Sequence, residues 1–330
     1  MAVKIGIPRS LFYYRLYPLW KAFFEELGAE LIVSEHTTRG ILDDGVRSCV
    51  DEACLPVKLF HGHVINIKDK VDYLFIPRLT SISKNEYICP QFGGLPDMVR
   101  HTLKDLPEII DTEINLRKSK NNALKSAFEI GRYLGRDKKA VKKAYKKAMA
   151  GFKSFEADAG KMGLPGDILD KKRRLQVVKT GEFLNIAVIG HPYNLYDSYI
   201  NMNLLKKLKD NGVDIITIEM VDENIINEKS NILTKKIFWN FGRKAVGSTM
   251  HLLDRSDVDG ILYVTSFGCG VDSFVGYIVE RMVRRRENIS FMALTIDEHS
   301  GEAGMNTRLE AFIDMIRWRK KNEDNLSAHG

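Results

Sequence analysis

Val3-Lys4-Ile5-Gly6-Ile7-Pro8-Arg9, at residues 3–9, is the stretch that decides the fold we expect. A short apolar run that ends at proline is typical of a buried strand, and apolar residues at helical spacing follow it as far as Gly28. The same pattern returns at residues 73–78, where Ile76-Pro77-Arg78 closes another apolar run. Strands that alternate with helices predict a parallel sheet with helices on its faces.

The alternation continues along the chain and predicts two α/β domains. Further strands are expected at residues 29–33, 184–189, 213–218, 260–265 and 290–296. Helices are expected at 17–27, 39–50, 57–67, 118–158, 198–211 and 231–254, and a capping box at Thr307 and Glu310 predicts a last one. Residues 79–97 are expected to form an irregular loop. The predicted domains are residues 1–115 and 183–330, and residues 116–182 form a helical, basic segment and linker between them.

The composition is that of an ordinary globular protein. The chain has 330 residues, of which 44% are hydrophobic and 28% charged, with a net charge of +7. No apolar run approaches the roughly 18 residues of a membrane helix, and the first residues do not resemble a signal peptide. We therefore expect a cytoplasmic protein without a membrane partner. The positive charge is too mild to indicate a nucleic-acid partner, although the basic residues at 132–147 could form a solvated face or a dock for an acidic partner.

Several catalytic and nucleotide-binding motifs are missing from the sequence. It has no G-x-x-x-x-G-K-[ST] loop and no G-x-G-x-x-G after the first strand, so we expect no ATP or NAD site. It also has neither G-x-S-x-G nor H-E-x-x-H.

The cysteines are the most informative residues. Cys49 falls on the apolar face of an expected helix and is interpreted as a core residue. Cys54 lies two residues before Pro56, and Cys89 and Cys269 each adjoin proline or glycine, all three outside any apolar stripe. They are either three unrelated loop thiols or ligands of one metal site. Three thiolates can bind zinc or an iron–sulfur cluster, and the absence of a C-x-x-C pair favours a [4Fe–4S] cluster with one iron lacking a thiolate.

Other polar residues follow the expected strands. Glu298 and His299 could be an acid–base pair beside the cluster, or could simply cap the last strand. Arg9 and Arg78 could bind an anionic substrate, pair with Glu298 or form structural ion pairs. Three histidines are weaker candidates for a site: His61, His63 and His191.

Five motifs together carry a resemblance to a known family. They are Ile5-Gly6-Ile7-Pro8-Arg9, Asp51-Glu52-Ala53-Cys54-Leu55-Pro56-Val57-Lys58, Tyr87-Ile88-Cys89-Pro90, Ser266-Phe267-Gly268-Cys269-Gly270, and residues 297–304 with 307–312. With these motifs the chain resembles the 2-hydroxyacyl-CoA dehydratase component superfamily. Within it, the similarity points to the domain of unknown function that is often fused behind the ATPase part of acyl-CoA dehydratase activases.

The resemblance implies two flavodoxin-like domains and a [4Fe–4S] cluster held by Cys54, Cys89 and Cys269. In such dehydratases an ATP-dependent activator delivers a low-potential electron, which reaches a CoA thioester and allows a ketyl radical to lose a hydroxyl group. The implied partners are that activator, a CoA thioester, and a second dehydratase-like subunit or a second copy of the chain. A related branch carries a double-cubane cluster and reduces small molecules. The alternatives are a non-catalytic electron-transfer or scaffold subunit, and a cluster-free binding protein with incidental thiols.

Overall fold

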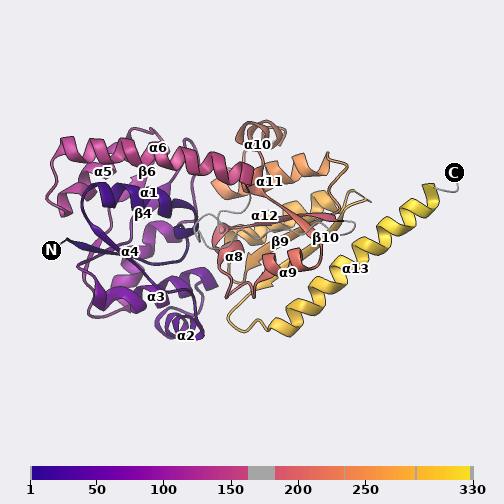
Figure 1. Ribbon diagram of the computed structural model, residues 1–330, viewed down its shortest axis with the longest axis horizontal. Coiled ribbons are helices and arrows are strands. Elements are labelled where there is room, and N and C mark those ends of the chain that lie inside the picture. The colour runs from indigo at the N-terminus through magenta and orange to yellow at the C-terminus, as the bar shows by residue number, and fades with distance from the viewer. Residues whose placement is uncertain (1, 163–182, 234, 287, 328–330) are drawn as a thin grey trace. The chain divides into compact units, whose positions relative to one another are not determined.

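The computed structural model describes residues 2–162, 183–233, 235–286 and 288–327 (Figure 1). The chain forms two compact units, each with its own sheet and core. Unit 1 comprises Met1–Lys172 and Ile237–Gly242, and unit 2 comprises Arg173–Lys236 and Arg243–Gly330. The two-domain parallel α/β class is confirmed. The predicted linker at 163–182 lies outside the described residues, and the predicted boundaries at 115 and 182 stay predictions.

Unit 1 is built on a four-stranded parallel sheet. Its order is β2 (Glu30–Val33), β1 (Lys4–Ile7), β3 (Tyr73–Phe75) and β5 (Glu108–Ile110). A second parallel pair, β4 (Arg78–Ser81) and β6 (Glu113–Asn115), continues β3 and β5. Pro77 separates β3 from β4 because proline has no N–H to donate to a sheet. The hydrogen bonds from the Ile76 and Arg78 amides to Ile110 and Thr112 nevertheless keep the two pairs in line.

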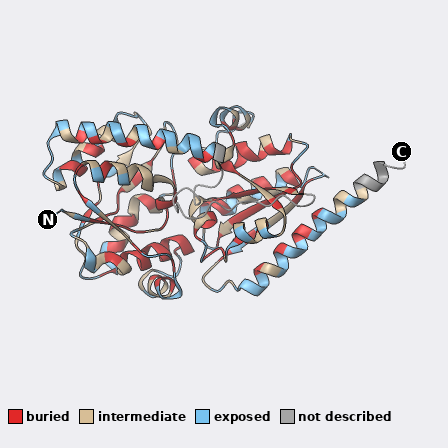
Figure 2. Ribbon diagram, in the orientation of Figure 1, coloured by how far each residue is buried: buried red, intermediate tan, exposed pale blue. Residues whose placement is uncertain are grey.

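Helices cover the sheet of unit 1 and bury their apolar faces (Figure 2). They are α1 (Tyr13–Glu26), α2 (Arg39–Ser48), α3 (Leu55–Ile67), the 3-10 helix η1 (Lys68–Lys70), α4 (Gln91–Thr102), α5 (Asn122–Tyr133) and α6 (Lys138–Met162). Among these helices α3 is the most deeply buried, since every residue from Leu55 to Val64 is buried. An apolar stripe that includes Val141 and Ala148 packs α6 onto α1 and α5.

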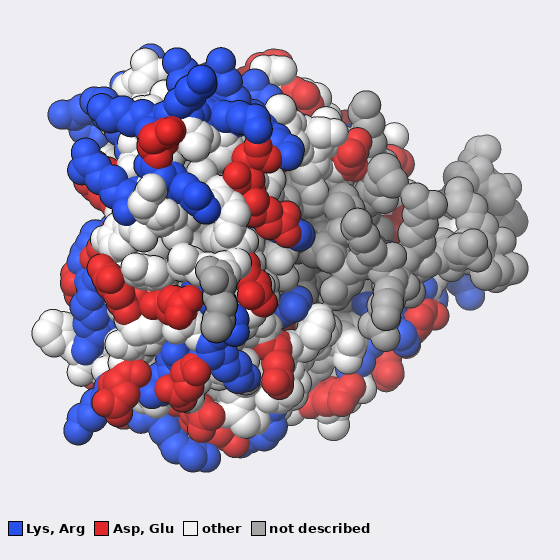
Figure 3. Space-filling view, turned by 60° about the vertical axis from the view of Figure 1, so that its left-hand side comes forward, with Lys and Arg blue, Asp and Glu red and all other residues white. Residues whose placement is uncertain are grey.

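The outer face of α6 is basic (Figure 3). The described lysines of α6 are exposed, which fits both a solvated face and a dock for an acidic partner. Two of them, Lys143 and Lys147, reach Glu26 of α1 at 2.8 and 2.6 Å. These ion pairs lower the pKa of Glu26 to about 2, the hydrogen bond from Lys143 having the largest effect.

Unit 2 is a second parallel sheet, with the order β10 (Ser290–Ile296), β9 (Gly260–Ser266), β7 (Leu184–Gly190) and β8 (Val213–Thr217). Its helices are α8 (Pro192–Tyr196), α9 (Leu204–Asp210), the 3-10 helix η2 (Ile218–Met220), α10 (Glu223–Ser230), α11 (Asn240–Leu253), α12 (Gly270–Val283) and α13 (Glu302–Ser327). The strand order changes direction between β7 and β9. In open α/β sheets this switch point is where ligands bind, at the carboxyl ends of the strands.

Several predicted element boundaries were wrong. The loop expected at 79–97 is confined to residues 82–90, since β4 precedes it and α4 follows it. The stretch expected to be helical at 118–158 consists of two helices, α5 and α6, which are separated near Gly135, where φ is +60°. The last helix begins at Glu302, so Thr307 lies inside it and bonds the carbonyl of Ala303 instead of capping the helix. No helix in the described ranges has the length and apolar content needed to cross a bilayer.

Candidate functional site

The switch point of unit 2 brings two loops together. His191 follows the last residue of β7, and Cys269 lies in the turn after β9. Gly190 allows this approach, because a Cβ there would lie 2.8 Å from the carbonyl oxygen of Val264 on β9. A larger residue would push the two strands apart at the point where their loops begin.

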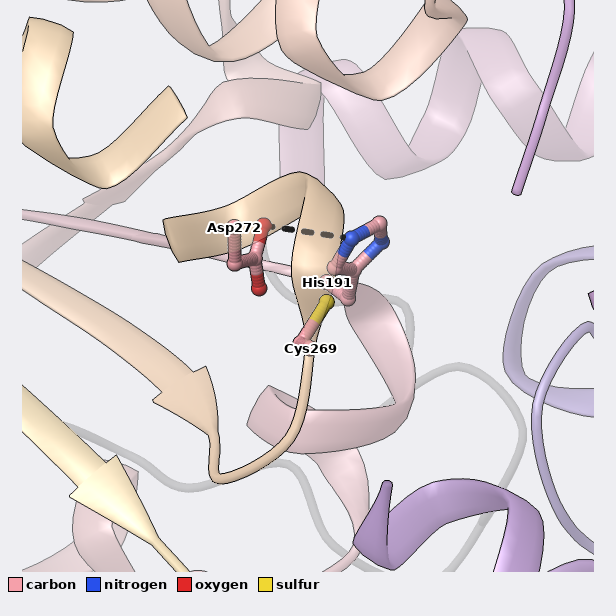
Figure 4. A group of neighbouring side chains, drawn as sticks. All are labelled: His191, Cys269 and Asp272. Carbon is pink, nitrogen blue, oxygen red and sulfur yellow. Dashed lines mark ion pairs between the residues drawn. The ribbon is translucent and has the colours of Figure 1, made fainter. Parts of the chain in front are cut away.

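Three potential metal ligands meet at this point (Figure 4). One ligand atom each from His191, Cys269 and Asp272 lies within 4.8 Å of the others. The Nε2 atom of His191 is 3.4 Å from Oδ1 of Asp272. The imidazole is stacked on the ring of Tyr193, with 4.8 Å between centroids and 9° between planes. An imidazole, a thiol and a carboxylate are all ligands that transition metals accept.

Asp272 is held rigidly in the first turn of α12. Its side chain is fully buried, Oδ1 accepts a hydrogen bond from the Tyr263 hydroxyl at 3.1 Å, and Oδ2 accepts one from Thr265 at 3.1 Å. A carboxylate also interacts favourably with the positive end of the helix dipole. Burial and then the charge of Asp272 raise the pKa of Tyr263 well above its usual value, so Tyr263 stays a hydrogen-bond donor.

Cys269 is the N-cap residue of α12. Gly268, with a φ of +78°, makes the tight turn before it. The Cys269 amide donates to the carbonyl of Ser266, and the Ser266 hydroxyl donates to Oδ1 of Asn194 on α8. The other side-chain atom of Asn194, Nδ2, is buried without a hydrogen-bond partner among the described residues. The loops that follow β7 and β9 are thus joined by a hydrogen bond. Beside it, Nδ2 of Asn194 is a donor without an acceptor among the described residues.

In unit 1, Cys54 and Cys89 also lie at helix starts. Cys54 is the N-cap of α3, and Cys89 immediately precedes Pro90, the N-cap of α4. The Cys54 thiol lies 3.7 Å from Oε1 of Gln91, the first residue of α4, so the two helix starts are neighbours. All three predicted ligands are therefore at helix N-termini, where free amides and the helix dipole favour a thiolate.

Cys49 lies at the end of a helix and not at the start of one. The interpretation of Cys49 as a core residue was wrong. Helix α2 ends at Ser48, and Cys49 is its half-buried C-cap in extended conformation. Its neighbour Val50, expected on the same apolar face, is 52% exposed. Burial raises the pKa of the Cys49 thiol, whereas a metal ligand needs the thiolate.

The loop that carries Cys89 is hydrogen-bonded to residues 238–240, and this contact was not predicted from the sequence. Tyr87 donates its amide to the carbonyl of Phe238 at 2.8 Å, and its own carbonyl accepts the amide of Asn240 at 2.8 Å. The side chain of Asn240 also donates to Glu86 at 2.6 Å and to Ser83 at 3.1 Å. These contacts lie within unit 1, which includes residues 237–242. Trp239 in that segment forms an isolated β-bridge with Tyr87.

Arg78 is tied into an ion network. Its guanidinium contacts Asp97 at 2.5 and 2.6 Å and Asp111 at 3.1 Å, and Arg100 contacts both carboxylates as well. The bonds with Asp97 raise the pKa of Arg78, and the same contact lowers the pKa of Asp97. The geometry matches the structural ion pair considered from the sequence, and a substrate role for Arg78 stays a prediction.

Arg9 and His63 form a polar cluster behind β1 and β2. The Arg9 backbone amide donates to the Ser34 hydroxyl at 2.8 Å, its Nε donates to the Ser34 carbonyl at 3.1 Å, and its guanidinium lies over the ring of Tyr13. His63 is fully buried, with Nδ1 2.9 Å from the Ser34 hydroxyl and Nε2 3.1 Å from that of Thr37. Both ring nitrogens of His63 are engaged by hydroxyls, so His63 fits a structural role. A substrate role for Arg9 stays a prediction.

Glu298 and His299 lie in the turn after β10. Asp297 organises this turn: its carboxylate accepts the His299 amide at 2.8 Å and the Ser300 hydroxyl at 3.1 Å. His299 is exposed and Glu298 is half-buried. The bonding agrees with a strand cap, and their acid–base role stays a prediction.

Comparisons with protein families cover nearly the whole described chain. Residues 4–221, well over half of it, match the family described as CoA enzyme activase uncharacterised domain. The chain belongs to that family. Residues 199–316 also match the family described as 2-hydroxyglutaryl-CoA dehydratase, D-component. Together the two matches confirm the resemblance to the dehydratase superfamily. No curated protein matches the chain.

The two matched segments of this activase-domain protein divide the candidate ligands between them. The activase-domain match contains Cys54, Cys89 and His191, and the D-component match contains Cys269 and Asp272. Asp272 is the residue that sequence reasoning missed. It lies in the first turn of α12, and only packing shows that its carboxylate faces His191.

Proposed function

We propose that Cys54, Cys89 and Cys269 together bind one [4Fe–4S] cluster. The observation that carries the proposal is their shared position at the N-termini of α3, α4 and α12. A cluster with thiolate ligands is anionic, and helix N-termini stabilise anions through free amides and the helix dipole. Cys49, at a helix C-terminus, has no such support.

The buried Nδ2 of Asn194, which has no hydrogen-bond partner among the described residues, supports the fit of a cluster at this site. A buried N–H without an acceptor costs about 1–3 kcal/mol, and Asn194 is tied through Ser266 to the turn that carries Cys269. The sulfurs of a cluster accept hydrogen bonds of this kind, which tune its reduction potential. This buried donor and the three cysteines at helix starts support the proposed fit of an iron–sulfur cluster.

We further propose that the chain is a component of a dehydratase-type system. When bound, the cluster would supply low-potential electron transfer. An ATP-dependent activator would deliver the electron, since this sequence has no ATP-binding loop. The substrate would be a small activated molecule such as a CoA thioester, undergoing dehydration or reduction. The proposed roles of Arg9 and of Glu298 with His299 are anion binding and proton transfer.

The first test is the iron content of cysteine variants purified without oxygen. We expect about four irons and four sulfides per wild-type chain, the content of one [4Fe–4S] cluster. Cys54→Ala, Cys89→Ala and Cys269→Ala should each lose most of the iron, and Cys49→Ala, the matched control, should keep it. Zinc in place of iron in the wild-type protein, or equal iron in all four variants, would refute the proposal.

A second measurement tests the reaction. The iron-loaded chain is incubated with an activator ATPase, ATP, a reductant and a series of 2-hydroxyacyl-CoA thioesters. Formation of the 2-enoyl-CoA product that depends on both ATP and Cys269 supports the dehydratase role. Reduction of the cluster without product, even after a second dehydratase-like subunit is added, would instead identify an electron-transfer subunit.

A further inference from the structure

The last helix of unit 2, α13, has a second apolar face that its own sheet does not cover. Its inner face consists of Met305, Leu309, Phe312, Ile313 and Ile316, all of which are buried. These side chains pack against β9, close to Gly260. On the outer side, Ala311, Met315 and Trp318 are exposed, Met315 by 47% and Trp318 by 69% (Figure 2). A surface helix normally carries polar residues on that side.

The exposed apolar residues form one row along the helix. Ala311, Met315 and Trp318 follow one another after four and then three residues, so their side chains lie on the same side of α13. Tryptophan and methionine are enriched in protein interfaces, where truncating a tryptophan often removes a large share of the binding energy. A row with this spacing is suited to packing against another helix.

A second row, made of charged residues, runs beside the first. It consists of Glu310, Asp314, Arg317 and Lys321, all of them exposed. The two acids come first along the helix and the two bases follow. Arg317 lies 3.7 Å from Asp314 and donates to the carbonyl of Asn211. Glu310 and Lys321 have no ion-pair partner among the described residues.

The charged row is complementary to itself when two copies of α13 pack antiparallel. A two-fold axis perpendicular to both helices brings each flank of one helix against the same flank of the other, in reverse order. The axis that pairs Glu310 of one copy with Lys321 of the other crosses the helix between residues 315 and 316. The same axis pairs Asp314 with Arg317, because both pairs have the same midpoint. Each acid therefore faces a base of the other copy.

The same axis also fits the apolar row. It places Trp318 of one copy between Ala311 and Met315 of the other, so the large indole lies against the smallest residue of the row. This contact occurs twice, once from each copy, as an isologous interface requires. The charges and the apolar side chains thus agree on one axis. Such agreement favours a second copy of the chain over an unrelated partner.

We propose that two copies of the chain associate through this outer face of α13, packed antiparallel. The inference does not depend on the proposed cluster, because α13 carries none of its ligands. One pair of helices forms an interface at the low end of the size range, below the roughly 1,200–2,000 Å² of stable complexes, so the dimer forms in a concentration-dependent way. The exposed ion pairs contribute mainly to the orientation and to the choice of partner.

The first test is sedimentation equilibrium of the full chain, purified without oxygen, over a range of concentrations. The wild type should dimerise as its concentration rises. Trp318→Ala should lower the association constant by at least about tenfold, because it removes the largest contact. Phe274→Ala is the matched control: it removes a 59% exposed aromatic ring from α12 of the same unit and should leave the association unchanged. A wild type that stays monomeric, or equal effects of the two variants, overturns the inference.

A charge exchange tests the orientation and the identity of the partner. In the proposed dimer, Glu310→Lys and Lys321→Glu each bring like charges together at two places, so each variant alone should associate about tenfold more weakly. An equimolar mixture restores opposite charges at both places and should associate about as tightly as the wild type. Both residues are exposed, so the exchanges should not alter the stability of the monomer. A mixture that associates no better than either variant alone overturns the inference.

The iron content separates this inference from the proposed function. None of the substitutions changes a proposed ligand, so all variants should keep the iron content of the wild type. A dimeric wild type without iron would overturn the proposed function and leave the α13 contact standing. An iron-loaded wild type that stays monomeric would overturn the α13 contact alone.

Discussion

The fold strongly opposes protonation of His63. Burial, followed by the charges of Arg9 and His36, lowers its pKa from 6.5 to about 3. Among the described residues, the groups hydrogen-bonded to its nitrogens are the hydroxyls of Ser34 and Thr37, neither of which is a carboxylate that would stabilise the protonated ring. As pH falls, the unfolded chain therefore binds this proton before the folded chain does. The contribution of His63 to stability is complete above pH 6.5 and is lost progressively as pH falls towards 3.

We therefore predict that His63→Gln makes the protein less sensitive to acid. Between pH 6.5 and 4 the free energy of unfolding of the wild type should include a loss of up to about 1.4 kcal/mol per pH unit from this one group. The variant should be less stable at pH 7, because hydrogen bonds to Ser34 and Thr37 are disturbed, but its slope should be smaller. Urea unfolding at several pH values measures both. Parallel pH profiles for wild type and variant would contradict the assignment, and His101→Gln is the exposed control.

At the scale of elements, the strands with strong sequence signals were predicted closely. The expected bounds of β1, β9 and β10 differ from the observed ones by about one residue, because proline, glycine or a polar turn ends each apolar run. Short or interrupted elements were missed. β5 has three residues, and α4 contains Gly93, Gly94 and Pro96, which resemble a loop in the sequence. Packing of its buried side chains, such as Phe92 and Val99, stabilises α4 despite these residues.

The candidate site was partly predictable for the same reason. Proline or glycine within two residues of Cys54, Cys89 and Cys269 indicated turns, and all three cysteines lie at helix starts. His191 was recognised from its place after a strand, but no local pattern connects it with Cys269. That connection depends on the strand order of unit 2, which a single sequence does not specify.

The contact between α2 and α3 depends on two glycines. A Cβ on Gly62 would lie 1.9 Å from the carbonyl oxygen of Ile41, and one on Gly45 would lie 2.1 Å from that of Lys58. Backbone atoms cannot move aside as a flexible side chain can. The two helices therefore touch backbone to backbone, and α3 is the helix whose N-terminus carries Cys54.

We predict that Gly62→Ala destabilises the protein by about 1–3 kcal/mol or more through overpacking. Because α2 must separate from α3, the iron content should fall as well. Gly151→Ala is the matched control: Gly151 is exposed in α6 with nothing near its Cβ position, so alanine should stabilise the helix by about 0.5–1 kcal/mol. Denaturant unfolding compares the two variants. Equal effects of the two substitutions would show that the close contact is not important for stability.

At the scale of the whole molecule, the path of the chain links distant segments to the cysteine loop. Residues 237–242 belong to unit 1, although the residues on both sides of them belong to unit 2. This segment pairs with Tyr87, two residues before Cys89, and Asn240 bonds Glu86 and Ser83. The loop that presents one proposed cluster ligand is thus ordered by a part of the chain that lies far along the sequence.

Asn240→Ala should loosen this loop without unfolding either unit. The variant removes the side-chain bond to the Glu86 carboxylate, and a hydrogen bond to a charged group contributes about 1.5–3 kcal/mol. Amide hydrogen exchange at Tyr87, whose N–H donates to Phe238, should accelerate on the order of 10–100-fold, while exchange in the central strands stays unchanged. Asn121→Ala, at an exposed residue without a capping bond, is the control. Because Cys89 lies on the same loop, Asn240→Ala should also release iron to a chelator faster than the control does. Fast exchange with unchanged iron release would mean that Cys89 does not hold the cluster through this loop.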